Sequence, residues 1–140
     1  MKAAPKVMHR GFTLVEVMIT VVVVAILSSI GYATYTAQIA KSRRAAARAL
    51  VMDVMQHEER FYTENSTYTT DLTAMGYGAT LYTDRNTHSI SLAAGASGAI
   101  ATSVAVTATA VTSDPKCTAM TLTSANAQSG TGSQPTVCWR

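Results

Sequence analysis

The chain has 140 residues, of which 48% are hydrophobic, so it has room for one small globular domain and an appended segment. Large apolar residues are few after Thr63, which excludes a large core in the C-terminal part. The net charge of +3 does not by itself indicate a nucleic-acid-binding protein, because the excess lies in the residues before Gly11 and in one short basic stretch.

The first predicted element is an apolar helix over residues 12–33. These 22 residues carry one charge, Glu16, and as a helix they measure about 33 Å, close to the roughly 30 Å of a bilayer's hydrocarbon core. The β-branched run Val21–Val24 disfavours a helix in water, but a single span in lipid must satisfy its own backbone hydrogen bonds. The run therefore predicts a membrane-spanning helix.

Glu16 is an expensive residue to place in such a helix, at about 2.5–3.5 kcal/mol near a helix centre and less toward its end. In one interpretation its carboxylate reaches the membrane interface and stays hydrated. A plain signal anchor is also possible for the whole run, but it does not explain Glu16. In another interpretation of Glu16, the chain is cut between Gly11 and Phe12, and the new α-amine of Phe12 lies on the same helix face as the carboxylate. The two groups could then pair within one chain or between two chains.

The sequence GFTLVEVMITVVVVAIL, which begins at Gly11, resembles the N-terminus of type IV prepilins. The resemblance implies that residues 1–11 are a leader, cleaved after Gly11 by a prepilin peptidase that also methylates the Phe12 amine. It implies as well that Glu16 pairs with the Phe12 amine of a neighbouring subunit when the inner-membrane assembly machinery adds it to a filament. Such a pair sets register more than it adds stability.

Residues 34–62 are predicted to continue the same helix as an amphipathic half, since no proline occurs between Pro5 and Pro115. Many family members have a proline where this chain has Ala33, and Gly31 is the remaining weak position, at a cost of about 1 kcal/mol in a helix interior. The apolar positions expected to face a core are Ile39, Ala46, Leu50, Val51, Val54 and Phe61.

A basic stretch lies between these apolar positions and consists of Lys41, Arg43, Arg44 and Arg48. The favoured interpretation is a hydrated helix face. The alternatives are contact with lipid headgroups, with acidic patches of neighbouring subunits, or with nucleic acid.

Residues 63–140 are predicted to form an α+β head. The segment Arg60–Gly78 is a polar connection that resembles the loop after the long helix in PilE-like minor pilins, with Leu72 and Met75 holding it to the core. Three or four antiparallel strands should pack on the amphipathic half-helix and give the pilin fold, with a thin core of valine and leucine. The predicted strands cover 88–92, 100–111 and 117–123, and the core residues named from them are Val104, Val106 and Leu122.

Cys117 and Cys138 are either two buried thiols or one disulfide, and an oxidising compartment favours the disulfide. The bond would contribute roughly 3 kcal/mol by chain entropy and would close a loop that is too polar to hold itself. The resemblance implies the C-terminal disulfide loop of pilins, which is exposed on the filament, and the ending Cys138–Trp139 also resembles the PilE-like group.

Catalytic and metal-binding patterns do not emerge from the sequence, so neither an enzyme nor a cofactor is expected. His57 and His88 are isolated, and Glu58 and Glu59 are expected to be hydrated. Major pseudopilins of type II secretion resemble pilins but bind calcium through acidic residues near the C-terminus. This chain has no Asp or Glu after Asp114, which makes it a poor calcium binder.

The function predicted is therefore a structural subunit, of the minor PilE-like kind, in a type IV pilus. It would be a single-pass inner-membrane protein before assembly and part of the surface filament afterwards, where the family serves adhesion, twitching motility or natural transformation. The alternatives are a DNA receptor in transformation, a bitopic anchor with a periplasmic binding head, and a pseudopilin. From Asp53 onward the chain has seven acids and four bases, which favours a scaffold over DNA binding by the head. Any DNA binding is expected to depend on the basic stretch at 41–48.

Overall fold

A computed structural model describes residues 11–140, except for the side chains at positions 30, 31 and 33. The predicted leader lies outside the described residues, apart from Gly11. The chain divides into two compact units, one ending at Gln38 and the other running from Ile39 to Arg140. This division falls five residues after the boundary expected at Ala33.

The helix α1 covers Leu14–Asn65, a length of 52 residues, and continues across Gly31 without interruption. At its start the Thr13 hydroxyl accepts a hydrogen bond from the Glu16 backbone N–H at 3.2 Å, which satisfies one of the free donors of the first turn. At its end Ser66 adopts a φ of 58°, and its N–H donates to the Tyr62 carbonyl at 2.8 Å. The prediction of one long helix is confirmed, and the helix ends three residues later than expected.

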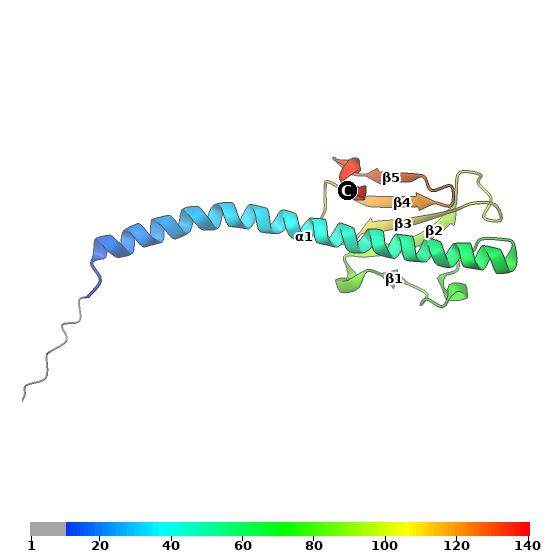
Figure 1. Cartoon of the computed structure of the whole chain (residues 1–140), viewed down its shortest axis with the longest axis horizontal. Helices are drawn as coiled ribbons and strands as arrows, with labels where there is room; N and C mark the ends of the chain where they lie inside the picture. Colours follow the sequence, from blue (N-terminus) through cyan, green and yellow to red (C-terminus); the bar gives the residue numbers. More distant parts are fainter. Residues whose placement is uncertain (1–10) are drawn as a thin grey trace, which may run out of the picture. The chain divides into compact units, whose positions relative to one another are not determined.

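A five-stranded antiparallel sheet forms the rest of the second unit, with the strands in sequential order (Figure 1). Its strands are β1 (Leu81–Tyr82), β2 (His88–Ala94), β3 (Val104–Ala110), β4 (Ala119–Thr123) and β5 (Gln128–Thr131). Three short 3₁₀ helices connect or follow them: η1 (Leu72–Met75), η2 (Asp84–Asn86) and η3 (Pro135–Trp139).

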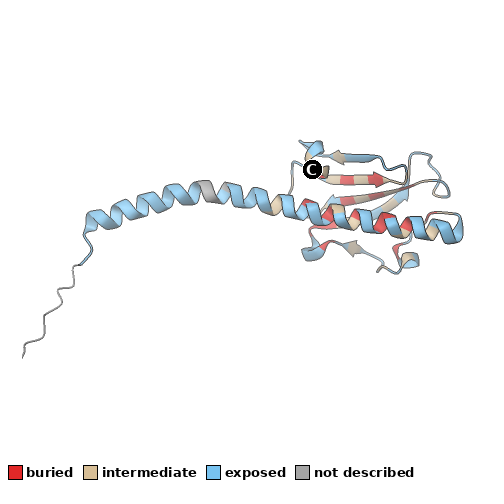
Figure 2. Ribbon diagram, viewed as in Figure 1, coloured by how far each residue is buried: buried red, intermediate tan, exposed pale blue. Residues whose placement is uncertain are grey.

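The core lies between α1 and one face of this sheet, as the buried positions in Figure 2 show. Alternate residues of the strands point to one face, so the register aligns the apolar ones: Leu92 is opposite Val106, and Val106 is opposite Leu122. Val104 and Val106 are fully buried, and Leu122 nearly so. The α+β pilin-like fold and its thin core are confirmed.

The buried face of α1 agrees in part with the predicted one. Val51 and Val54 are fully buried, as predicted, whereas Ala46 is exposed. The other predicted positions are partly buried, namely Ile39, Leu50 and Phe61. The face also includes residues that were not predicted, namely Arg44, Ala47, Met55 and Glu58. A pattern based on hydrophobicity alone assigns charged residues to solvent, so it could not include the arginine and the glutamate.

The sheet has two strands more than the three that the sequence delimited. The extra β1 has only two residues, and β5 lies inside the polar segment that was expected to be a loop. A tight turn between β4 and β5 makes this hairpin: Asn126 has a φ of 58°, and its N–H donates to the Thr123 carbonyl at 2.8 Å. This segment is therefore held in place by backbone hydrogen bonds to β4, which the pattern of apolar residues along the sequence cannot reveal.

The connection after α1 is pinned as predicted. Leu72 is buried, and Met75 packs against the core from a partly buried position. Asp71 caps η1 by accepting from the Thr73 N–H at 2.9 Å, and Gly76 follows with a φ of 87°.

Candidate functional site

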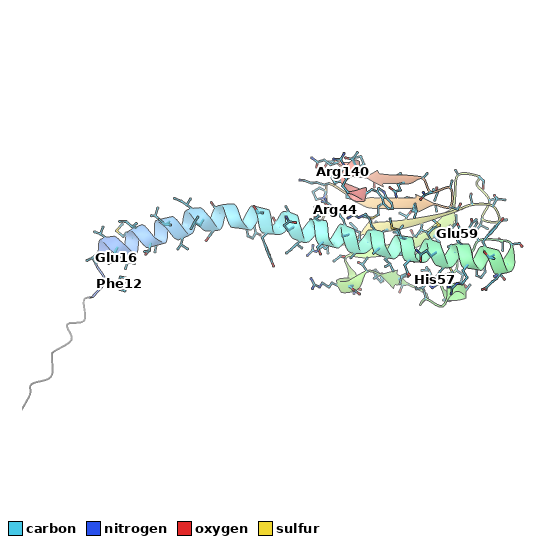
Figure 3. All side chains as sticks on the ribbon, in the orientation of Figure 1. Phe12, Glu16, Arg44, His57, Glu59 and Arg140 are labelled. Atoms are coloured by element: carbon cyan, nitrogen blue, oxygen red, sulfur yellow. A yellow bond between two sulfur atoms is a disulfide. The ribbon has the colours of Figure 1, made fainter. Side chains whose placement is uncertain are left out.

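The predicted processing and assembly residues come together at the start of α1. Gly11, Phe12, Thr13 and Glu16 line one open hollow, and the Phe12 side chain is 81% exposed. Figure 3 shows Phe12 just before the first turn and Glu16 within it. Glu16 lies in the first turn, where the helix dipole favours a negative charge and where a new amine on Phe12 would be close by.

The first half of α1 presents an apolar surface all round. From Leu14 to Leu27 its valine, leucine, isoleucine and methionine side chains are about half exposed or more, and the helix is long and apolar enough to cross a membrane. Soluble monomers rarely expose apolar areas of this size, so the surface is suited to lipid or to other apolar partners.

Cys117 and Cys138 form a disulfide, with their Cα atoms 5.4 Å apart and both residues fully buried, which confirms the predicted bond. The bond ties η3 to the start of β4. Gly130 of β5 is required at this junction: a Cβ there would lie 2.7 Å from the Cys138 Sγ and 2.7 Å from the Pro135 carbonyl oxygen. The close packing of η3 on β5 thus depends on one glycine and one disulfide.

Arg44 binds Asp114 of the β3–β4 loop through two parallel hydrogen bonds. The Nε atom donates to Oδ2 at 2.6 Å and Nη2 donates to Oδ1 at 2.8 Å, and both side chains are only 11% exposed. The guanidinium holds the pKa of Asp114 below its usual value, and the backbone N–H groups of Lys116 and Cys117 also donate to this carboxylate. The placement of Arg44 on an exposed basic surface is therefore wrong.

The other three residues of the predicted basic surface remain accessible. Lys41 and Arg43 are exposed, and Arg48 is partly exposed. They lie beside the sheet end where β2 begins and β3 ends, because Asp114 reaches Arg44 from the β3–β4 loop.

Charge is strongly polarised along the second unit. We name the end that contains Arg44 the basic end. It has two acids, Asp84 and Asp114, and seven cations. The cations are Lys41, Arg43, Arg44, Arg48, Arg85, Lys116 and Arg140. The part of α1 from Asp53 onward and the loop after it form the acidic end, with one cation, Arg60, and five acids: Asp53, Glu58, Glu59, Glu64 and Asp71. Figure 3 places Arg44 and Arg140 toward one end of the sheet and His57 and Glu59 toward the other.

Comparisons with known proteins identify the family. Residues 33–121 match a family described as "Type IV minor pilin ComP, DNA uptake sequence receptor", and this match covers more than half of the chain. The chain belongs to this type IV minor pilin family. Residues 7–32 of the minor pilin match the prokaryotic N-terminal methylation motif, the segment that holds Gly11, Phe12 and Glu16. The comparison with curated proteins gives no match.

Membership settles the broad function of the chain. It is a minor pilin of the type IV pilus, a structural protein rather than a member of an enzyme family, and its apolar N-terminal helix fits membrane anchoring before it enters the pilus. The match favours this function over the pseudopilin and the bitopic anchor.

Glu58 of the minor pilin was expected to be hydrated, and this expectation is wrong. The side chain is 0% exposed; its Oε2 accepts from the Thr69 N–H at 3.2 Å, and its Oε1 has no hydrogen-bond partner among the described residues. Burial raises the pKa of this carboxyl. Glu59 is exposed, as expected, and accepts from the Tyr68 hydroxyl at 3.1 Å.

The two histidines of the minor pilin differ in setting. His88 is buried at the start of β2, its Nδ1 lies 3.2 Å from the Thr87 hydroxyl, and burial lowers its pKa, which favours the neutral form. His57 lies at the acidic end, where its Nδ1 is 2.8 Å from the Tyr77 hydroxyl, which in turn donates to Asp53 at 2.7 Å. The cluster of Asp53, His57 and Tyr77 fastens the loop after η1 to α1. It could not be predicted from the sequence, because Asp53 and Tyr77 are 24 residues apart.

Proposed function

We propose that this minor pilin is an inner-membrane protein that is cleaved after Gly11, enters the pilus through its N-terminal helix, and binds DNA at the basic end of its head. Two kinds of observation support the proposal: the start of α1 supports the steps of assembly, and the charge distribution of the head supports DNA binding.

In the assembly steps, a prepilin peptidase removes residues 1–11 and methylates the amine of Phe12. The inner-membrane assembly machinery then moves the subunit out of the bilayer. The Glu16 carboxylate forms an ion pair with the protonated Phe12 amine of a neighbouring pilin. In the apolar filament core this pair replaces the hydrogen bonds that the carboxylate made with water. An unpaired carboxylate there would cost several kcal/mol, so the pair selects one axial register between subunits.

The observation that carries DNA binding is the concentration of cations at one end of the head. Duplex DNA is a dense line of negative charge, so affinity comes mainly from cations gathered on one surface. The Arg44–Asp114 pair neutralises one of the two acids at this end, which leaves six cations and Asp84 to set the potential there. The family description names a DNA uptake sequence receptor, which is consistent with this assignment.

The sequence-based preference for a scaffold rested on the total of acids and bases after Asp53. That total hides the separation of the two signs. The acidic end repels a phosphate backbone, so a duplex should lie across the β3–β4 loop, where Lys116 is, and η2, where Arg85 is.

The test uses the full chain in a non-ionic detergent and a fluorescent duplex, with binding followed by anisotropy. A triple variant, Arg43→Gln, Arg85→Asn and Lys116→Gln, removes three exposed cations and leaves the structural Arg44 in place. Asparagine is chosen at Arg85 because that residue has a φ of 65°, which asparagine tolerates. We expect the variant to bind at least tenfold more weakly, with a salt dependence whose logarithmic slope is smaller by up to about 3.

The matched control is Arg60→Gln, the single cation of the acidic end, which should leave the affinity unchanged. A loss of binding free energy in the control that reaches one third of the loss in the triple variant, in proportion to one charge against three, would mean that only net charge matters and would overturn the basic end as the interface. If the wild-type chain binds no duplex at physiological salt, the proposed DNA binding is overturned, and the scaffold role of a minor pilin is what stands.

A further inference from the structure

The sheet edge formed by β5 carries an open hollow of about 420 Å³. The residues that line it are the aromatic Trp139, the cationic Arg140 and the polar Gln128, Ser129 and Thr136, together with Gly130 and Pro135. We name this hollow the Trp139 notch. It lies between β5 and η3, and Figure 3 places Arg140 beside them, toward the basic end.

The notch is rigidly built. The indole Nε1–H of Trp139 donates to the Ser129 carbonyl at 2.7 Å, which fixes the orientation of the ring. The preceding residue, Cys138, is held by the disulfide, and the absence of a side chain on Gly130 lets η3 pack directly on β5. An aromatic side chain fixed in this way loses little entropy when a ligand stacks on it.

The chemistry around the notch suits a ligand that is both aromatic and anionic. Residues 115–140 contain no Asp or Glu. The Gln134 N–H donates to the Lys116 carbonyl at 3.0 Å, so the start of η3 adjoins a cation of the basic end. Gln128 and Ser129, which also line the hollow, have side chains that can form hydrogen bonds. Aromatic platforms next to cations are the usual means of holding an unstacked base.

We propose that the Trp139 notch holds one unpaired nucleobase of DNA while the phosphates beside it lie along the basic end. This inference rests on the proposed DNA binding and adds a second mode to it: the basic end binds duplex by charge, and the notch adds affinity for a frayed end or a single-stranded overhang. In the competing account Trp139 only protects the edge of β5 by covering the Ser129 carbonyl.

Trp139 is the single tryptophan of the chain, so its fluorescence reports directly on the notch. The experiment titrates the full chain in detergent with three DNAs of equal duplex length: a blunt duplex, one with a three-nucleotide overhang, and one whose overhang is abasic. Anisotropy of labelled DNA gives the affinity, and tryptophan emission gives stacking. We expect the overhang to bind at least fivefold more tightly than the other two and to quench Trp139 saturably, and the abasic overhang to behave as the blunt duplex does.

Two variants separate stacking from protection of the edge. Trp139→Leu should abolish the preference for the overhang and keep the affinity for blunt duplex. The control is Tyr82→Leu, an exposed aromatic residue on the opposite edge strand, which should keep the preference. Both variants are compared at a temperature where circular dichroism shows them folded.

The outcomes distinguish the notch from the function on which it rests. Binding of all three DNAs with equal affinity and unchanged Trp139 emission overturns the notch and leaves DNA binding by the basic end intact. A preference that survives Trp139→Leu also overturns it. Failure of the wild-type chain to bind any of the three DNAs overturns both proposals.

Discussion

Arg44 and Asp114 are 70 residues apart in the sequence and join α1 to the β3–β4 loop through two parallel hydrogen bonds. The loop they fix leads directly to Cys117, and so to the disulfide and η3. One ion pair thereby links the helix that enters the filament to the C-terminal part of the head.

Replacing Arg44 with methionine should lower the free energy of unfolding by about 2 kcal/mol at pH 7, because Asp114 would be left as an unpaired, largely buried carboxylate. The pair lowers the pKa of Asp114, so its stabilisation is fully present above the ordinary carboxyl pKa of about 4 and is lost as the pH falls toward the lowered value. The difference between wild type and Arg44→Met should accordingly shrink below pH 4. Urea denaturation followed by Trp139 fluorescence measures both effects.

The control for that variant is Arg43→Met, which changes an exposed neighbour and should alter stability by less than about 0.5 kcal/mol. Equal losses in the two variants would show that the Arg44–Asp114 pair is not a specific tie between helix and loop.

Glu58 should show the opposite pH dependence. Its pKa is raised by burial, so its contribution to stability is fully present below the unfolded value of about 4.3 and is lost as the pH rises through the folded value. Glu58→Gln keeps an oxygen for the Thr69 N–H and removes the charge. It should raise the free energy of unfolding at pH 7 by about 1 kcal/mol, and this gain should vanish near pH 4.

Glu64→Gln is a suitable control for this change, because Glu64 is exposed on the same helix. A Glu58→Gln protein that is less stable than wild type at pH 7 would indicate that the charged form has a favourable role.

The disulfide should stabilise the head by roughly 3 kcal/mol, given the sequence separation of 21 between its cysteines. Cys117→Ser combined with Cys138→Ser removes it, and η3 and β5 should then become the first segments cleaved by protease. Reducing agent should lower the denaturation midpoint of the wild type and leave the double variant unchanged. Non-reducing peptide mapping that recovers two free thiols from the wild type would contradict the bond.

The parts of the fold with a strong local pattern could be predicted from the sequence. The uninterrupted apolar run predicted α1, and alternation in the region of β3 placed Val104 and Val106 in the core. The strand β5 could not be predicted this way, since it is polar and its order comes from pairing with β4 and from η3.

The candidate site shows the same contrast. Gly11, Phe12 and Glu16 occur at fixed spacing within one motif, so the sequence could name them as candidates, and their roles in processing and assembly stay predictions. Arg44 and Glu58 could not be placed, because the partners that allow their burial are Asp114, far along the chain, and a backbone N–H in the following loop. Charge balance is incomplete for a related reason, because a total of acids and bases taken along the sequence does not show that the two signs lie toward opposite ends of the head.

Glu16→Gln tests the proposed role in assembly. The variant should insert into the membrane at least as well as wild type, because the cost of the carboxylate is removed. Its amount in sheared pili should fall at least several-fold, because the Phe12 amine of a neighbour loses its partner. Immunoblots of membrane and pilus fractions give both quantities, and wild-type amounts of the variant in pili would contradict the pairing.

The most direct test of the account is the mass of the N-terminal peptide of the chain recovered from pili. The account predicts a mature chain that starts at Phe12 with one methyl group on its α-amine, and a Gly11→Val variant that stays uncleaved in the membrane. An intact Met1, or a chain cut after Ala33 or later, would contradict the proposed cleavage after Gly11 and the pairing of Glu16 with the Phe12 amine that depends on it.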